Sequence, residues 1–285
     1  MKRDSIYSMW FLAPAIIIFS VFFLLPTFIS VPFSMTVWSF TDVTFVGLEN
    51  FRAFFSNSNL TQTMLNTLKF AVLTCAFKLF FAFFLSVFLT SKIRTKNFLR
   101  AVVFFPTLVS TIATGITFSA LMHPSRGLIN TVIRFFGINA PDWLGNARLA
   151  LYSVIMVDVW RGVGIATVIF IAGITSIDSS YYEAASIDGA TSWQQLKYIT
   201  LRLVRPAVNS VLILAFISGL RTFDLIWTMT GGGPGFASEV MASQIYKQFA
   251  SGFWGMSAAG NVIMLVIIAI IVFPLYRFVL GKEVD

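Results

Sequence analysis

Six long apolar stretches constrain this chain more than any other feature of its sequence. They lie at residues 10–33, 65–90, 100–122, 149–174, 206–228 and 257–280. As an α-helix, each stretch of about 20 residues or more crosses a hydrocarbon layer roughly 30 Å thick. The stretches lack the alternation of membrane β-barrel strands, and backbone groups in lipid need partners within their own segment. The sequence therefore predicts an all-α, polytopic membrane protein with six transmembrane helices in a single domain over 1–285.

The composition favours lipid as the main surroundings of the chain. Of 285 residues, 57% are hydrophobic and only 11% are charged, whereas soluble domains average about 25% charged residues. The net charge of +8 does not indicate nucleic-acid binding, because the basic residues gather at the ends of the apolar stretches. One cysteine and one histidine provide no metal cage, and the phosphate-loop pattern does not occur. If ATP drives this protein, another chain hydrolyses it.

The basic residues also indicate the orientation, because Lys and Arg are more frequent in loops on the cytoplasmic side. With the N-terminus inside, that side holds Lys2, Arg3, Lys92, Arg94, Lys96, Arg100, Lys197, Arg202, Arg205, Arg277 and Lys282. The opposite side holds only Arg52, Arg126, Arg134, Arg148 and Lys247. This excess predicts that both termini are cytoplasmic. The first stretch is predicted to stay as an anchor, because its apolar run is longer than that of a cleaved signal peptide.

The loop at 175–205 carries helix signals outside the apolar stretches. The segments SYYE (180–183) and SWQQ (192–195) each have the spacing of a capping box, which predicts that a helix starts at each. Gly189 lies between them and predicts a left-handed stop. The second helix is expected to end or bend before Pro206. The loop is therefore predicted to be a helix-turn-helix elbow between the fourth and fifth spans.

At this elbow the sequence resembles a known family. The segment EAASIDGA (183–190), followed by ITL (199–201) and Pro206, resembles the EAA loop of ABC importer permeases. The DGA ending is similar to that of the carbohydrate-uptake family of maltose-type and glycerol-3-phosphate-type permeases. Three further segments resemble that family, namely FVGLENF (45–51), GLIN (127–130) and TGGGP (230–234).

The resemblance implies a fold, partners and a site. The fold is that of a type I ABC importer permease. Its partners are a second, homologous permease, two copies of an ATP-binding subunit and an extracellular solute-binding protein. ATP and magnesium belong to the ATP-binding subunits, so this chain is expected to hold no cofactor, no metal and no catalytic residue. The helix in the loop would rest in a cleft of the ATP-binding subunit and couple to it through Glu183, Ala184, Ala185, Asp188 and Gly189.

Elementary chemistry agrees with such a contact, because small alanines permit close approach, Glu183 offers a charge and Gly189 permits the elbow. The spacing alone leaves open that Glu183 only caps its helix. Arg202 stands where the family has a proline, so the resemblance does not extend to the kink at that point. The TGGGP segment lacks the lysine of a phosphate loop and predicts a tight external turn.

Ionisable side chains within the apolar stretches suggest a wet cavity, because facing lipid costs several kcal/mol. Asp158 with Arg161, and Arg221 with Asp224, have i, i+3 spacing and are predicted to pair on one helix face. In the orientation above, both pairs fall in the outer half of the membrane, where a solute would enter. Sugars are bound by bidentate polar groups and aromatic faces. The candidate translocation path therefore comprises Asp158, Trp160, Arg161, Arg221, Asp224 and Trp227.

Other interpretations of these residues stay open at this level. The same pairs fit structural ion pairs that close the bundle or join the partner permease, and an interfacial aromatic belt accounts for Trp227 without a ligand. Lys69 and Lys78 either snorkel to the interface or meet carboxylates of another subunit. His123 is expected in a loop.

The sequence thus predicts a permease subunit of an ATP-driven importer that moves a carbohydrate across the cytoplasmic membrane of a prokaryote. Glycerol-3-phosphate or a related polyol is the alternative substrate. An ion-coupled secondary transporter is less favoured, because no repeat is visible and the acids lie beside arginines. A membrane enzyme is disfavoured because one His, one Cys and no acidic cluster leave little for a catalytic constellation.

Overall fold

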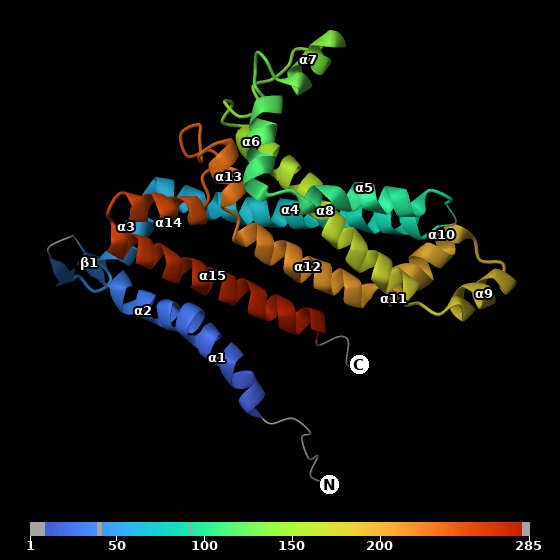
Figure 1. Ribbon diagram of the computed structural model, residues 1–285, viewed down its shortest axis with the longest axis horizontal. Helices are drawn as coiled ribbons and strands as arrows, with labels where there is room; N and C mark the ends of the chain where they lie inside the picture. Colours follow the sequence, from blue (N-terminus) through green and yellow to red (C-terminus); the bar gives the residue numbers. More distant parts are fainter. Residues whose placement is uncertain (1–8, 39–41, 92, 281–285) are drawn as a thin grey trace. The chain divides into compact units, whose positions relative to one another are not determined.

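The computed structural model describes residues 9–38, 42–91 and 93–280, and its elements are helices apart from one small hairpin (Figure 1). The chain divides into two compact units, one of residues 1–61 and 244–266 and the other of residues 62–243 and 267–285. The divisions fall within three helices, namely α4 (Ser58–Thr90), α14 (Met241–Ala250) and α15 (Trp254–Leu280). Lys2, Arg3, Lys92 and Lys282, which enter the orientation argument, lie outside the described residues, and the orientation stays a prediction.

The first unit begins with a helical stretch over Trp10–Ser34, as the sequence predicts. Its pieces are η1 (Met9–Leu12), α1 (Ala13–Phe19), the π-helical η2 (Ser20–Leu24) and α2 (Leu25–Ser34). An antiparallel hairpin, β1 (Thr36–Trp38) with β2 (Val43–Phe45), and α3 (Glu49–Ser56) follow. Asn50 joins these pieces, because its side-chain amide donates to the carbonyl oxygens of Ser34 and Thr36, each at 2.9 Å. The hairpin and α3 lie between the first and second apolar stretches of the sequence.

The second unit is a helical bundle built around α4 and α8 (Ala150–Thr175). Its other elements are α5 (Lys96–Leu108), α6 (Thr111–Leu121), α7 (Leu128–Phe135), α9 (Ser179–Ile187), α10 (Ser192–Gln195), η3 (Leu196–Thr200), α11 (Leu201–Leu203), α12 (Arg205–Leu220) and α13 (Asp224–Met229). Four helices of the described chain are long and apolar enough to cross a membrane, and up to six spans result if each of two bent pairs counts as one. The chain is therefore a multi-pass, all-α membrane protein.

The stretch expected as one helix over 100–122 is two helices that meet at 96°. The expectation of a single helix is wrong because Val109 and Ser110 both have extended ψ angles of 137°. The Ser110 carbonyl then accepts the Thr114 amide at 2.9 Å, which begins the new helix. Both halves are apolar, so hydropathy alone does not reveal the bend.

The stretch expected as one helix over 206–228 is also interrupted. Helix α12 ends at Leu220, and α13 begins only at Asp224. The expected bend before Pro206 is confirmed, since Ser192–Leu203 and α12 meet at 64°. Proline lacks the amide that would continue the preceding helix and its ring excludes a straight path, so the new helix starts beside it.

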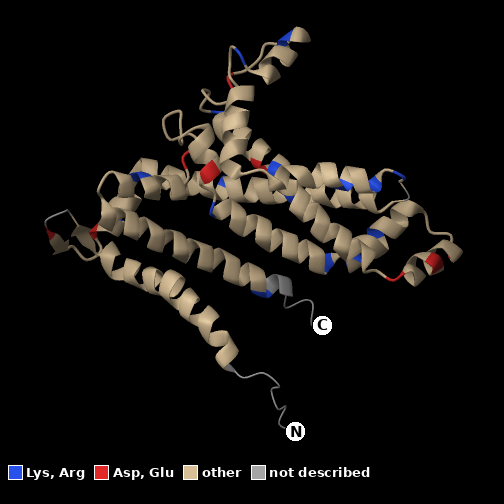
Figure 2. Cartoon of the chain, in the orientation of Figure 1, with Lys and Arg blue, Asp and Glu red and all other residues tan. Residues whose placement is uncertain are grey.

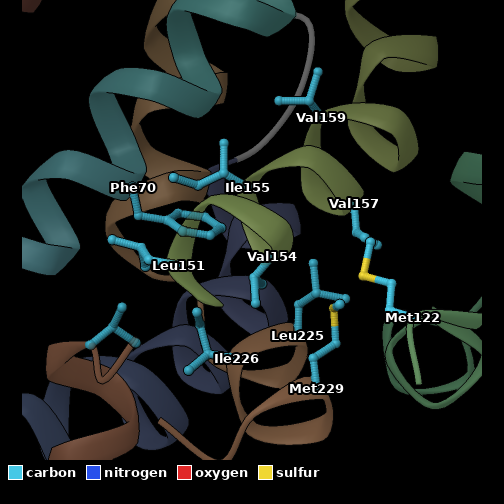
Figure 3. Close-up of a cluster of buried hydrophobic side chains, with 11 residues drawn as sticks. Phe70, Met122, Leu151, Val154, Ile155, Val157, Val159, Leu225, Ile226 and Met229 are labelled. Atoms are coloured by element: carbon cyan, nitrogen blue, oxygen red, sulfur yellow. The ribbon is translucent and has the colours of Figure 1, made fainter. Parts of the chain in front are cut away.

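The core of the second unit packs α4, α8 and α13 together around Phe70, Val154 and Ile226 (Figure 3). A second cluster joins α4, α8 and α12 through Ala82, Phe170 and Val211. Helix α8 takes part in both clusters. Both interrupted stretches, α5–α6 and α12–α13, therefore pack against it.

Candidate functional site

Helix α9 is the exposed helix predicted between the fourth and fifth spans. No residue of α9 is buried, and Ile187 is 87% exposed. Glu183, Ala184, Asp188 and Gly189 are also exposed, whereas Ala185 is half-buried. Figure 2 shows charged residues gathered at this end of the second unit, near α5 and α9 to α12. The structure thus presents the predicted coupling residues on an accessible helix.

The two predicted capping boxes are each misplaced. Helix α9 is capped by Asp178, whose carboxylate accepts the Ser180 amide at 2.8 Å, so the box expected from Ser180 to Glu183 is wrong. The helix begins at Ser179 because the Asp178 carboxylate directly before it accepts the amide of the second helical residue, Ser180. The second box is formed by Thr191 with Gln194 rather than one residue later, because the extended backbone of Thr191 lets its hydroxyl accept the Gln194 amide.

The cap at Asp178 predicts a pH dependence. Its hydrogen bonds from Ser180 hold the pKa of the Asp178 carboxyl below its ordinary value. A lowered folded-state pKa means that the cap stabilises α9 fully above the unfolded pKa and is lost as the pH falls through the folded one. We expect amide exchange at the start of α9, corrected for its intrinsic rate, to accelerate in that acidic window. Asp178→Asn is expected to flatten this dependence, and an unchanged acid response in that variant would contradict the assignment.

The end of α9 follows the sequence prediction. Gly189 has a φ of +77°, in the left-handed region, and nothing lies within 4 Å of the place where its Cβ would be. The Ala190 amide donates to the Ala185 carbonyl at 2.8 Å, which closes the helix end. The predicted stop at Gly189 is confirmed. Arg202 introduces no bend of its own, since the break lies at Val204, and its guanidinium lies 5.9 Å from the Tyr198 ring centroid.

Within the bundle, Asp158 pairs with Lys78 rather than with Arg161. The Lys78 Nζ lies 2.5 Å from the Asp158 Oδ2, and the side chains are only 6% and 14% exposed. The expected pairing along one helix is wrong because Gly162 leaves room for a lysine from the neighbouring helix. A Cβ at Gly162 would lie 2.6 Å from the Lys78 Cε. The alternatives of snorkelling or an intersubunit partner for Lys78 are thereby replaced by a pair inside one chain.

Arg161 lies at the break between α5 and α6. Its Nε donates to the Val109 carbonyl at 3.4 Å, and the Thr107 hydroxyl donates to the Arg161 carbonyl at 3.0 Å. The guanidinium therefore supplies a partner to a backbone oxygen that the interrupted helix leaves free. Asp158 and Arg161 hold α8 to α4 and to the α5–α6 break.

The other predicted pair is separated by an interruption of the helix. Arg221 follows the last residue of α12 and Asp224 begins α13, so the expected shared helix face does not exist. Both side chains are exposed, and Trp227 is 39% exposed and stacks with Phe223 at 5.7 Å between ring centroids. Trp160 is 43% exposed and lies 5.1 Å from the Phe118 ring. Four of the six candidate path residues thus keep accessible side chains.

Sequence reasoning missed the role of Asn66. Its side-chain amide lies within 3.0 Å of the Phe236 carbonyl, 3.2 Å of the Ala237 carbonyl and 3.0 Å of the Glu239 carbonyl. This contact holds the loop that begins with the predicted glycine turn. The sequence signal for this contact was an asparagine at the edge of an apolar stretch. A buried side-chain amide needs hydrogen-bond partners, so Asn66 could be expected to bind another segment. His123 lies in a loop, as expected.

Residues 78–280 match the family described as "Binding-protein-dependent transport system inner membrane component". The chain is 30% identical to the trehalose/maltose transport system permease protein MalF of Thermococcus litoralis, over 85% of this chain and 84% of that protein. It is also 30% identical to the arabinooligosaccharides transport system permease protein AraP of Bacillus subtilis, over 94% and 88%.

A solved structure shares the fold. A chain of a bacterial ABC transporter involved in the import of the acidic polysaccharide alginate superposes with a TM-score of 0.83 at 21% identity. The superposition covers 94% of this chain and 93% of the other. This chain therefore has the fold of a chain in a solved ABC transporter.

Proposed function

Because the chain belongs to the family of inner membrane components of binding-protein-dependent transport systems, and so is an ABC importer permease, we propose that it moves a saccharide across the cytoplasmic membrane of a prokaryote. The observation that carries the proposal is the family match over 78–280, which includes α9. Relatives named for trehalose, maltose and arabinooligosaccharides support a saccharide as the substrate. The family match supports a transport subunit that leaves ATP hydrolysis to another chain.

The proposed assembly needs three kinds of partner. They are a second, homologous permease, two copies of an ATP-binding subunit that hold ATP and magnesium, and an extracellular solute-binding protein. A solved structure of a bacterial alginate ABC transporter in complex with an alginate pentasaccharide-bound periplasmic protein supports the last of these. We propose that α9 contacts the ATP-binding subunit through Glu183, Ala184, Ala185, Asp188 and Gly189, since these residues are accessible or half-buried.

The proposed translocation path uses the interruption between α12 and α13. Charged side chains at membrane depth face a wet cavity or a partner rather than lipid, and Arg221 and Asp224 are both exposed here. Trp160 and Trp227 would offer aromatic faces to a sugar ring. Asp158 and Arg161 would support the wall of the path, because their contacts run to α4 and α5.

Uptake of labelled saccharides tests the function. In cells lacking this gene, we expect uptake of one class among trehalose, maltose and short arabino-oligosaccharides to fall by at least tenfold and to return with the intact gene. Amino-acid uptake in the same cells serves as the control. Unchanged uptake of every saccharide in the panel would contradict the proposal.

A further inference from the structure

Helix α9 needs more than its chain ends to transmit a displacement. It has no buried residue, and it is followed by Gly189, which has open space around it. A helix attached only through such a flexible stop would swing without moving its neighbours. The side-chain contacts of α9 therefore decide which membrane helix follows it.

Two hydrogen bonds attach one face of α9 to the segment that leads into α12. The hydroxyls of Tyr182 and Thr200 lie 2.9 Å apart, and the Gln195 Nε2 donates to the Ser186 Oγ at 3.0 Å. Tyr182 and Ser186 are four residues apart, so they lie on the same face of the helix. Glu183 and Ile187 follow them by one residue and so lie on a different part of the helix surface; Tyr182 is half-buried, whereas Ser186, Glu183 and Ile187 are exposed. One face is held while another stays accessible.

Thr200 is a firm anchor for this contact. It is 6% exposed and ends η3, four residues before Val204 at the bend into α12. Val204 is fully buried and packs in the cluster with Ala82 and Phe170. A force applied at Tyr182 therefore reaches the base of α12, whose other end lies at the Arg221 interruption.

We infer that the Tyr182–Thr200 hydrogen bond is a positioning contact that makes α9 and α12 move as one body. This inference rests on the proposed function, because it assumes that an ATP-binding subunit displaces α9. Tyr182 does not touch the substrate. Its hydroxyl directs the movement into α12 rather than letting it dissipate at Gly189.

The test uses the complete transporter reconstituted in vesicles with its binding protein. The probe is whichever of trehalose, maltose or a short arabino-oligosaccharide requires this gene for uptake. We expect Tyr182→Phe and Thr200→Val each to lower the saccharide moved per ATP hydrolysed by roughly threefold to tenfold, since a net hydrogen bond shifts an equilibrium by about that factor. The double variant should lose no more than either single one, because both remove the same contact. Binding of the ATP-binding subunit should stay as in wild type. Thr200→Ser, which keeps the hydroxyl, should leave the saccharide moved per ATP hydrolysed close to that of wild type.

Tyr181→Phe is the matched control, because Tyr181 is adjacent and its side chain is 56% exposed. It should leave the transport ratio unchanged. An unchanged ratio in Tyr182→Phe would overturn the inference, as would additive losses in the double variant or an equal loss in Tyr181→Phe. If Thr200→Val fails to assemble, Tyr182→Phe with Thr200→Ser still decides the matter. Failure of the proposed function is distinguishable, because wild type would then move no saccharide.

Discussion

Replacing Lys78 by methionine, with Asp158 left in place, is expected to remove most of the folded permease from the membrane. The two side chains are 2.5 Å apart at Nζ and Oδ2 and are nearly buried. Removing one partner of a buried ion pair leaves an uncompensated charge and costs about 3–5 kcal/mol. We expect a collapse of the monodisperse peak in size-exclusion chromatography of detergent extracts and a large fall in melting temperature.

The matched experiments isolate the pair. Asp158→Asn combined with Lys78→Met should recover much of the yield, because no charge then stays buried alone. Lys69→Met serves as the control, since Lys69 lies on the same helix but is exposed. A double variant as unstable as the two single changes combined would show that Lys78 and Asp158 do not act as a pair.

The second large effect is expected at Gly189. Gly189→Val should reduce ATP-driven transport by more than tenfold, because a β-branched residue at a φ of +77° forces the backbone out of the left-handed region. The stop of α9 would then shift and misplace the face that carries Glu183. The measurement is transport per reconstituted complex, together with co-purification of the ATP-binding subunit.

The chain offers a close control at Gly137. This glycine has a φ of +74°, follows α7, and also has nothing within 4 Å of its virtual Cβ. Gly137→Val therefore introduces the same local strain at a different helix end. Equal losses of transport in both variants would mean that general destabilisation, rather than the position of α9, explains the effect.

Hydropathy predicted the long helices well because apolarity over a membrane thickness leaves few other solutions. The stretches at 65–90 and 149–174 correspond to α4 and α8. The stop at Gly189 was also predictable, because only glycine adopts that backbone freely. Such features depend on the residues of one segment.

The interruptions and the ion pair were not predictable in this way. Pro106, the breaker residue of this stretch, lies inside α5 rather than at the bend, and the bend at Val109 and Ser110 has a partner from α8, because Arg161 donates to the Val109 carbonyl. The i, i+3 rule pointed Asp158 to Arg161, but a glycine one turn away admitted Lys78 from α4. The site therefore depends on packing between segments far apart in sequence, and the spacing within one helix does not contain that information.

The contact of Arg161 with Val109 means that residues 96–121 do not determine the bend between α5 and α6 by themselves. The bent backbone depends on a donor located 52 residues later in the chain. A substitution at Arg161 would therefore alter the course of a segment it does not belong to. Grafting residues 96–121 into an unrelated helical protein would not preserve the bend, because Arg161, which donates to the Val109 carbonyl, would be absent.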